Sequence, residues 1–430
     1  MDKKLIKRDI FERVSQHLNK AEITLITGPR QAGKTTLLRQ LKAWLIGERK
    51  VPSSKIFYFD LDLIKDWEFF QDQTEFIEYC RAEAGKSKIY VFVDEAQKVD
   101  DCARFFKGVY DSNLNLKLIL SGSSSFELKS KLKESLAGRK RIFSLLPFSF
   151  KEYVSGRANE LAHYIAGQKK IPILVRGKLL KHYFDYLVWG GYPRVALEPK
   201  REERIALLAE IYSSYIEKDI IGLLEIKNKQ GFTRLLSLVL AQTGQLVNIA
   251  ELANMANLDR DTIERYLYAL EQTFVLKPLL PYYSNQRQEI IKQNKIYAID
   301  SGLRNYILEN MTSLKQRPDA GFVLENGCFK EIWQASGSLE RLRFWRTKTG
   351  AEVDFVIARG TELLPIEVKS TLKKPQITQG LRNFIEKYSP ARAVVINLSL
   401  FDVELKIGKT RVSFIQPYEF LKYKEIFMTD

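Results

Sequence analysis

Residues 24–41, TLITGPRQAGKTTLLRQL, decide the fold of the first part of the chain. The apolar run ends at Thr27, two glycines frame a basic turn, and a lysine–threonine pair opens a helical pattern. The segment from Gly28 to Thr35 fits the spacing G-x-x-x-x-G-K-[ST] at every fixed position. Glycines at this spacing let the backbone approach a polyphosphate, so that successive N–H groups converge on its oxygens. The stretch therefore predicts a strand, a phosphate-binding loop and a helix.

This loop is predicted to bind ATP together with Mg²⁺. Lys34 supplies a point charge for the β- and γ-phosphates and acts in catalysis, and Thr35 supplies a hydroxyl ligand for Mg²⁺. The helix that follows directs its positive N-terminal end at the anion. The residues predicted to line the nucleotide site here are Gly28, Pro29, Arg30, Gln31, Ala32, Gly33, Lys34, Thr35 and Thr36.

The second part of the nucleotide site is predicted at IYVFVDE, residues 89–95, where a buried strand ends in two acids. Asp94 is expected to contact the nucleotide site by holding Mg²⁺, partly through water. Glu95 is expected to orient and deprotonate the attacking water. The pair thus supplies the metal ligand and the base that a phosphate-binding loop needs for hydrolysis.

Two further stretches carry candidate nucleotide contacts. In LKLILSGSSS, residues 116–125, Ser121 or Ser123 would sense the γ-phosphate, unless this segment is only a turn. In ESLAGRKRIF, residues 134–143, Arg139 or Arg141 would reach a neighbouring subunit's nucleotide as an arginine finger. A solvated basic run explains the second stretch equally well.

The bulk properties predict a folded protein with a polyanionic partner. The 430 residues suffice for roughly two to four domains, and 45% of them are apolar. The net charge of +16 and the pI near 9.4 favour nucleic acid, or an acidic membrane surface, as a partner. A solvated basic surface gives the same numbers.

The cysteines and the apolar runs exclude several classes. Cys80, Cys102 and Cys328 are isolated, and three histidines offer no zinc spacing. The N-terminal MDKKLIKRDI lacks the apolar core of a signal peptide, and no run approaches the roughly 20 apolar residues of a membrane span. We expect a cytoplasmic protein without a membrane segment.

The order of patterns along the chain predicts an α/β protein with four regions. Residues 1–150 alternate short apolar strands with helices, as a parallel sheet domain does. Residues 151–235 form a helical lid or linker, and residues 236–288 a winged-helix-like domain with a helix, a turn, a second helix and a β-hairpin. Residues 289–430 form a mixed α/β domain.

The winged-helix region has a poor charge balance for DNA reading. Its second helix carries Arg260 and Arg265 together with four acids, Asp259, Asp261, Glu264 and Glu271. A packing or subunit-contact role is therefore as reasonable as phosphate contact. The strand RLRFWRTK, residues 341–348, and the run from Arg139 to Arg141 are better electrostatic candidates for DNA contact. Phe344 and Trp345 could stack bases there, although such residues are more often core.

A second candidate site lies in AEVDFVIARGTELLPIEVKS, residues 351–370. In a strand, residues two apart share a face, so Glu367 and Lys369 point the same way. Asp354 would meet them across a hairpin that turns near Gly360, and Glu325 on the preceding helix would complete the set. Asp354, Glu367 and Glu325 could hold Mg²⁺ or Mn²⁺, and Lys369 could activate water or steady charge on phosphorus.

Several motifs together resemble one family. GPRQAGKTTLL, VDEAQKV, LILSGSSS, SLAGRKRIFSLLPFSFKEY, GGYPRV and YIEKDI are similar to the prokaryotic AAA-type, archaeal-like P-loop ATPases that carry a C-terminal domain of unknown function, DUF4143. The resemblance covers nearly the whole chain. It implies a P-loop NTPase fold, ATP binding and hydrolysis, and assembly as a homo-oligomer. The chain has Ser121 where better-known AAA motors have asparagine at the sensor position.

The C-terminal region resembles the PD-(D/E)xK nuclease fold, in the order helix, hairpin, E-x-K strand, helix and strand. This resemblance implies DNA, branched or broken, as a partner, and either metal-dependent cleavage or backbone binding without cleavage. The first functional hypothesis is an ATPase coupled to DNA binding or processing. The alternative is a nucleotide-switched regulatory oligomer that binds proteins and has an inactive C-terminal domain; a small-molecule kinase leaves that domain without a role.

Overall fold

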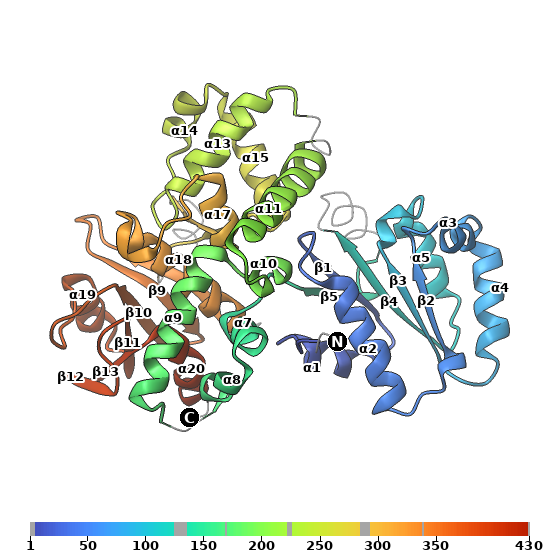
Figure 1. The fold of residues 1–430 in the computed structure, drawn as a ribbon, viewed down its shortest axis with the longest axis horizontal. Helices are drawn as coiled ribbons and strands as arrows, with labels where there is room; N and C mark the ends of the chain where they lie inside the picture. Colours follow the sequence, from blue (N-terminus) through green and yellow to red (C-terminus); the bar gives the residue numbers. More distant parts are fainter. Residues whose placement is uncertain are drawn as a thin grey trace. The chain divides into compact units, whose positions relative to one another are not determined.

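The computed structural model describes residues 5–123, 136–167, 170–221, 226–283, 293–337 and 339–428. The chain divides into two compact units, the first of residues 1–147, 213–225 and 272–274, the second of residues 148–212, 226–271 and 275–430. The serine-rich residues after Ser123 and the beginning of ESLAGRKRIF lie outside the described residues. Figure 1 shows the elements, coloured along the sequence.

The first unit is built on a five-stranded parallel sheet in the order β2-β3-β4-β1-β5. Its strands are β1 (Ile23–Gly28), β2 (Ile56–Asp60), β3 (Ile89–Asp94), β4 (Leu116–Ser123) and β5 (Lys140–Ser144). Its helices are α1 (Phe11–His17), α2 (Lys34–Gly47), α3 (Ile64–Trp67), α4 (Gln73–Ala84) and α5 (Cys102–Asp111). This is the parallel sheet domain of a P-loop NTPase that the sequence predicts.

Helices cover both faces of this sheet because its strands are apolar on both sides. One core joins residues of α4 and α5 to Leu25 and Val91, and the other joins α1 and α2 to Ile26 and Phe92. Figure 1 shows α2 on one side of the sheet and α4 and α5 on the other. Since all strands are parallel, their carboxyl ends share one edge, where the phosphate-binding loop and Asp94 lie.

The second unit contains the helical middle and a mixed sheet. Its helices are α7 (Phe150–Arg157), α8 (Asn159–Ala166), α9 (Ile173–Trp189), α10 (Pro193–Leu197), α11 (Arg201–Ile211), α13 (Lys229–Ala241), α14 (Ile249–Ala256), α15 (Arg260–Gln272), α17 (Ser301–Ile307), α18 (Ala320–Ala335), α19 (Gln379–Tyr388) and α20 (Phe420–Met428). Short 3₁₀ turns and a π-helical segment, Tyr212–Ile220, complete the described helical elements of the chain.

A two-stranded ribbon follows α15 in the second unit. It pairs β6 (Leu276–Leu279) antiparallel with β7 (Lys295–Ala298). The sequence analysis placed the hairpin before residue 288 and assigned KIYAID, residues 295–300, to the C-terminal region. The partner strand of the ribbon therefore comes from the segment that leads into that region.

The larger sheet of the second unit has the strand order β12-β13-β11-β10-β9-β8. These strands are β8 (Arg341–Arg346), β9 (Glu352–Arg359), β10 (Glu362–Lys369), β11 (Arg392–Asn397), β12 (Val403–Ile407) and β13 (Thr410–Ile415). β11 pairs in parallel with β10 on one side and with β13 on the other. The pairs β9–β10, β8–β9 and β12–β13 are antiparallel. The predicted hairpin is β9–β10, and Gly360 with φ of 57° lies at its turn.

Candidate functional sites

The phosphate-binding loop connects β1 to α2. Gly28 ends β1, and a Cβ atom there would lie 2.0 Å from the carbonyl oxygen of Leu145, so that position accepts glycine alone. Gln31 and Gly33 have φ of 59° and 97°, the left-handed region that bends the chain into a loop. α2 then begins at Lys34, so its unpaired N–H groups and its dipole point into the loop.

Two cations brace this loop from within. Lys34 is buried, and its ammonium group donates to the carbonyl oxygens of Gly28 at 3.1 Å and Pro29 at 3.0 Å. Arg8, also buried, donates to the carbonyl oxygens of Ala32 at 2.7 Å and Leu146 at 2.5 Å. The sequence analysis missed Arg8, because nothing in its local pattern marks it as different from the other basic residues near the N-terminus.

Asp94 ends β3 in a buried polar environment. It is 1% exposed, and its carboxylate accepts hydrogen bonds from the hydroxyl groups of Ser121 and, at 3.1 Å, Tyr58. Burial, followed by the charge of Asp94, raises the pKa of the Tyr58 phenol, so this group stays a donor. Ser121 therefore touches the acid predicted to bind magnesium, and Tyr58 is a partner that the sequence analysis missed.

Glu95 follows in a left-handed conformation, with φ of 57°. Its carboxylate accepts a hydrogen bond from Gln97, and its N–H donates to Ser121 Oγ at 3.4 Å. Thr35 lies half-buried in the first turn of α2 and Thr36 is exposed there. A threonine hydroxyl and a carboxylate are hard oxygen ligands, so Thr35 and Asp94 fit the Mg²⁺ that the family resemblance implies.

The structure does not bring Arg139 to this loop. Arg139 precedes β5, whose Lys140 is in register with Ile23 at the amino end of β1. Its guanidinium group pairs with Asp111 at 2.7 Å. Arg139 therefore lies at the edge of the sheet opposite to Gly28 and cannot contact the nucleotide of its own chain; contact with a neighbouring subunit's nucleotide stays a prediction.

The second site gathers at the β9–β10 hairpin. Asp354, 8% exposed, accepts a hydrogen bond from the N–H of Val368 at 2.7 Å. Lys369 pairs with Glu367 at 2.7 Å on the same strand. Glu367 is 3% exposed, and its Oε2 is buried without a hydrogen-bond partner. The predicted trio of Asp354, Glu367 and Lys369 thus lies together.

Glu325 of α18 also reaches this cluster, along with residues that the sequence analysis did not select. Glu325 accepts hydrogen bonds from Tyr297 at 2.6 Å and Lys295 at 3.3 Å. Lys295, 2% exposed, forms a second ion pair with Glu352. Lys295 and Tyr297 come from the ribbon strand β7, so only the tertiary fold brings them to the carboxylates.

The electrostatics of this cluster differ strongly from those of a surface site. Burial raises the pKa of Glu367 to about 8 and that of Glu325 to about 7; the charge of Asp354 adds to both shifts. Burial also raises the pKa of Asp354, against the opposing charges of Lys295 and Lys369. Crowded, desolvated carboxyl groups of this kind gather at functional sites, although structural networks can have them too.

Some features of the cluster suit a divalent cation, and others do not. The unpartnered Oε2 of Glu367 and the nearby Asp354 are oxygen ligands of the type that Mg²⁺ and Mn²⁺ accept. Lys295 already places one ammonium group between Glu325 and Glu352. Within the described ranges of the chain, no group of at least three His, Cys, Asp or Glu side chains has the geometry of a metal site.

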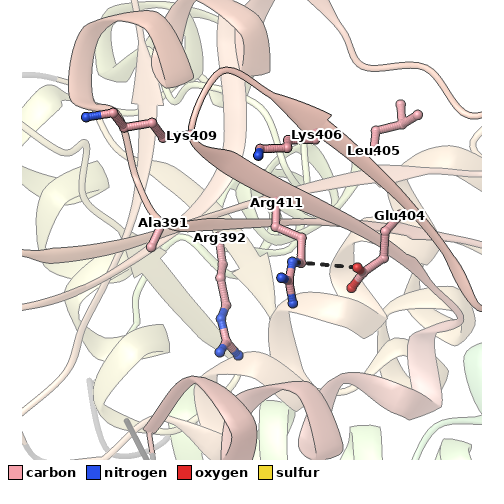
Figure 2. Close-up of a pocket in the computed structure, with 7 residues that line it drawn as sticks. All are labelled: Ala391, Arg392, Glu404, Leu405, Lys406, Lys409 and Arg411. Carbon is pink, nitrogen blue, oxygen red and sulfur yellow. Dashed lines mark ion pairs between the residues drawn. The ribbon is translucent and has the colours of Figure 1, made fainter.

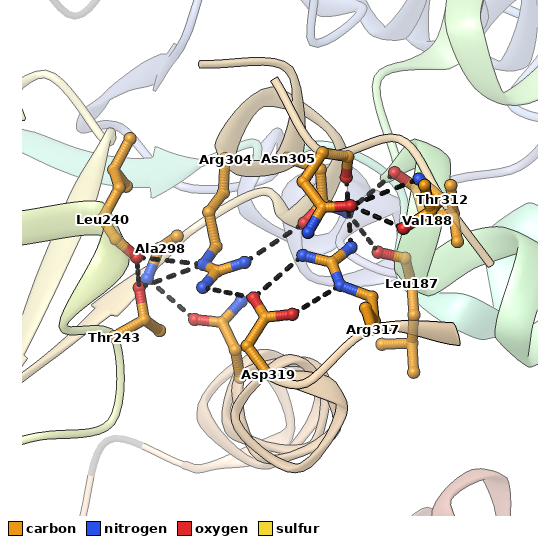
Figure 3. A network of polar contacts seen from close by, with 12 residues as sticks. Leu187, Val188, Leu240, Thr243, Ala298, Arg304, Asn305, Thr312, Arg317 and Asp319 are labelled. Atoms are coloured by element: carbon orange, nitrogen blue, oxygen red, sulfur yellow. Dashed lines mark hydrogen bonds and ion pairs between the residues drawn. The ribbon is translucent and has the colours of Figure 1, made fainter. Parts of the chain in front are cut away.

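A buried polar network fixes the start of α18 and so the position of Glu325. Asp319, just before α18, accepts from Arg304 at 3.1 Å and from Arg317 at 2.6 Å (Figure 3). Arg304 also donates to the carbonyl oxygen of Leu240 at 3.0 Å and to Thr243 at 3.3 Å. The network therefore joins the ends of α13, α17 and α18.

Several of the other residues considered for DNA contact are buried or paired with acidic side chains. Phe344 and Trp345 are 1% and 4% exposed, so they are core residues and cannot stack bases. Arg346 of the same strand pairs with Glu352 at 2.9 Å. On the exposed face of α15, Arg260 pairs with Glu264 at 2.9 Å, which leaves little net positive charge there.

Three family models match consecutive parts of the chain. Residues 20–154 match the model of the AAA domain, and residues 320–416 match the domain of unknown function DUF4143. Residues 180–314 match another domain of unknown function, DUF8612. The chain therefore contains an AAA domain, followed by two domains of unknown function.

Similar whole proteins have no assigned activity either. An uncharacterized protein of Mycobacterium tuberculosis is 26% identical over 395 residues, which is 91% of this chain and 79% of the relative. An uncharacterized protein of Methanocaldococcus jannaschii is 26% identical over 420 residues, covering 94% of this chain and 85% of the relative.

Parts of the chain also align with solved structures of other proteins. Caenorhabditis elegans PCH-2 aligns with a TM-score of 0.31 at 15% identity, over 61% of this chain and 70% of that one. AMPPCP-bound DnaA from Aquifex aeolicus aligns with a TM-score of 0.25 at 15% identity, over 61% of this chain and 86% of that one. Scores this low support no conclusion about function.

No helix in the described parts of the chain combines the length and the apolarity needed to cross a membrane. Cys80, Cys102 and Cys328 are buried, and none of the three forms a disulfide bond.

Proposed function

We propose that this chain hydrolyses ATP in its first unit and uses the second unit to bind and process DNA, as a homo-oligomer. The observation that carries the DNA half is the cluster of the buried Asp354 and Glu367 with the partly exposed Lys369 at the β9–β10 hairpin. Carboxylates beside a lysine on such a hairpin suit metal-dependent chemistry at a phosphodiester. The net charge of +16 supports a polyanionic partner.

In the ATPase half, the loop amides and the N-terminus of α2 bind the phosphates, and Lys34 leaves its carbonyl partners to contact the β- and γ-phosphates. Thr35 and Asp94 hold Mg²⁺, which neutralises charge on the phosphates when it is bound. Ser121 and Tyr58 keep the Asp94 carboxylate oriented. The Gln97 amide, which donates a hydrogen bond to the Glu95 carboxylate, first moves away. The freed Glu95 carboxylate then accepts a proton from the attacking water.

In the DNA half, Asp354 and Glu367 would hold a divalent cation, Mg²⁺ or Mn²⁺, and Glu325 would join them as a further ligand only after leaving Lys295 and Tyr297. A cation bound there would polarise a phosphate oxygen and generate a water nucleophile. Lys369, whose side chain is 38% exposed, is the group of the cluster that can reach a DNA phosphate.

The test combines binding, ATP turnover and cleavage. Labelled duplex, forked and single-stranded DNA are titrated at low salt by fluorescence anisotropy, and the ATPase rate is measured with each DNA. We expect binding of at least one form, a changed ATPase rate, and loss of turnover in Lys34→Ala. If no DNA form binds with or without ATP, the proposal is wrong.

Cleavage is tested separately, on supercoiled DNA with Mg²⁺ or Mn²⁺. Asp354→Asn and Lys369→Ala should remove any nicking while leaving ATP turnover unchanged. Glu386→Gln, which alters an exposed carboxylate of α19, is the matched control and should nick as the wild type does. Equal nicking by all four proteins would reject the cluster as the catalytic site.

A second candidate is a nucleotide-switched oligomer that binds proteins through an inactive second unit. The ion pairs of Lys295 favour it, because they satisfy Glu325 and Glu352 without a metal. This candidate predicts no nicking, no ATPase response to DNA, and an assembly state that changes between ATP and ADP. Mass photometry of the wild type and Lys34→Ala in both nucleotides measures the last point.

A further inference from the structure

A basic pocket lies at the outer part of the large sheet, apart from the carboxylate cluster of the same unit. It has a volume of about 440 Å³ and is lined by Ala391, Arg392, Glu404, Leu405, Lys406, Lys409 and Arg411 (Figure 2). Four of these lining residues are cationic and one is a carboxylate.

Strand register places three of the cations side by side. Arg392 of β11 is directly opposite Arg411 of β13, and Arg411 is directly opposite Lys406 of β12. Residues opposite one another on neighbouring strands share a face, so these three side chains form one basic row across the sheet. Figure 2 shows the guanidinium groups of Arg392 and Arg411 extending to the same side.

Like charges directly opposite one another destabilise a sheet. Glu404 offsets part of this repulsion: it lies 3.7 Å from Arg411 and also accepts a hydrogen bond from Ser413 at 3.0 Å. Lys409 adds a further cation at the β12–β13 turn, next to Gly408 with φ of 58°. An anion bound in the pocket would relieve the repulsion.

The basic row is separate from the carboxylate cluster. Glu367 is in register with Val395, and Val395 packs into the core on that face of the sheet. Arg392 is three residues before Val395 on β11, so by strand alternation it points to the opposite face. The row therefore belongs to a different surface from the one that the Glu367 side chain occupies.

We propose that the basic row of Arg392, Arg411 and Lys406 binds phosphate groups, and that these belong to a nucleic-acid backbone. Strands lie about 4.8 Å apart, so the row spans about 10 Å, which suits consecutive phosphates better than a single one. An arginine can bind phosphate with two parallel hydrogen bonds, and the exposed Lys406 and Arg411 beside the half-buried Arg392 are accessible to a polymer. Only the choice of nucleic acid rests on the proposed function.

The test removes two charges of the row and follows the salt dependence of DNA binding. The row variant is Lys406→Gln with Arg411→Gln. The control is Lys65→Gln with Lys86→Gln, which removes two exposed lysines of the first unit. Each phosphate contact contributes about 0.9 to the slope of log K against log salt, so the row variant should lose about 2 in slope and bind about tenfold more weakly.

Folding of the row variant is checked by circular dichroism and thermal unfolding. Because the substitutions remove repulsion, its midpoint should equal or exceed that of the wild type. A slope for the row variant that equals the slope of the control would overturn the inference while leaving the proposed function intact.

If the wild type binds no DNA, that result refutes the proposed function by itself. A second experiment then tests the phosphate site without DNA. Calorimetry with tripolyphosphate is then done in a Lys34→Ala background, which removes binding at the loop before α2. Saturable heat that disappears in the row variant identifies a site for free polyphosphate. No heat in that background would refute the phosphate site.

Discussion

Replacing Lys295 with methionine tests how the carboxylate cluster is neutralised. In the wild type the Lys295 side chain is 3% exposed, and its ammonium group lies 3.3 Å from Glu325 and forms an ion pair with Glu352. Removing one partner of a buried pair costs about 3–5 kcal/mol when the other stays charged. Glu325 can avoid that cost by taking up a proton, since its pKa of about 7 would rise further without Lys295.

The cost of the Lys295→Met substitution should therefore depend on pH. A carboxyl group with a raised pKa in the folded protein binds more protons folded than unfolded, so stability falls as pH rises from the unfolded to the folded pKa. The wild type and the variant should differ little near pH 5.5. At pH 8.5 the variant should be less stable by up to about 2 kcal/mol, because wild-type Glu325 ionises near pH 7 and each pH unit above that is worth about 1.4 kcal/mol.

A divalent cation should then replace the missing ammonium group. Mn²⁺ at a hundred times its dissociation constant stabilises the folded state by about 2.7 kcal/mol. For a unit of this size that corresponds to roughly 5 °C in the unfolding midpoint. Because the chain has two units, hydrogen exchange of β9 and β10 should accompany the thermal scans.

The matched control is Lys277→Met, on the paired strand β6, whose ammonium group pairs with Glu271 at 2.7 Å outside the cluster. The unfolding free energy of Lys277→Met should change with pH and with Mn²⁺ by the same amount as that of the wild type. The reasoning is refuted if Lys295→Met shows the pH dependence of the wild type. Strong stabilisation of the wild type itself by Mn²⁺ would favour the nuclease proposal over the regulatory one.

Three other substitutions test separate parts of the molecule. Glu95→Gln should keep nucleotide binding and lower ATP turnover by about 10²–10⁴-fold; full turnover in a steady-state assay would assign the base elsewhere. Burial lowers the pKa of Lys117 to about 7, so the folded protein loses that proton before the unfolded chain, and wild-type stability should rise between pH 7 and 9 by up to about 1.4 kcal/mol per pH unit. Lys117→Met should remove this slope in urea unfolding, and an unchanged slope would contradict the assignment. Asp319→Asn leaves Arg304 and Arg317 buried without their carboxylate and should lower the unfolding free energy of the second unit by about 3 kcal/mol; a loss below 1 kcal/mol in the same measurement would show that the pair is dispensable.

Short-range sequence patterns gave the parts of each site that lie within one loop or strand. The loop before Lys34, the acids at the end of β3 and the Glu367–Lys369 pair were all predicted from spacing alone. The contact of Arg139 with a neighbouring subunit's nucleotide stays a prediction, and only the parallel register of β5 shows that this residue lies at the far edge of the sheet from the loop of its own chain. Phe344 and Trp345 show the same limit, because exposure depends on what packs against a strand.

The sequence by itself determined the phosphate-binding loop and the later strand that ends in two acidic residues. Glycine conformations and strand periodicity depend only on a few neighbouring residues, so a short stretch is enough to predict them. Only the tertiary structure decided that Arg8 braces this loop and that Lys295 lies among the carboxylates. It also aligned Arg392, Arg411 and Lys406 across three strands. These groups are far apart in sequence, and their proximity depends on chain topology and sheet register, which local preferences do not specify.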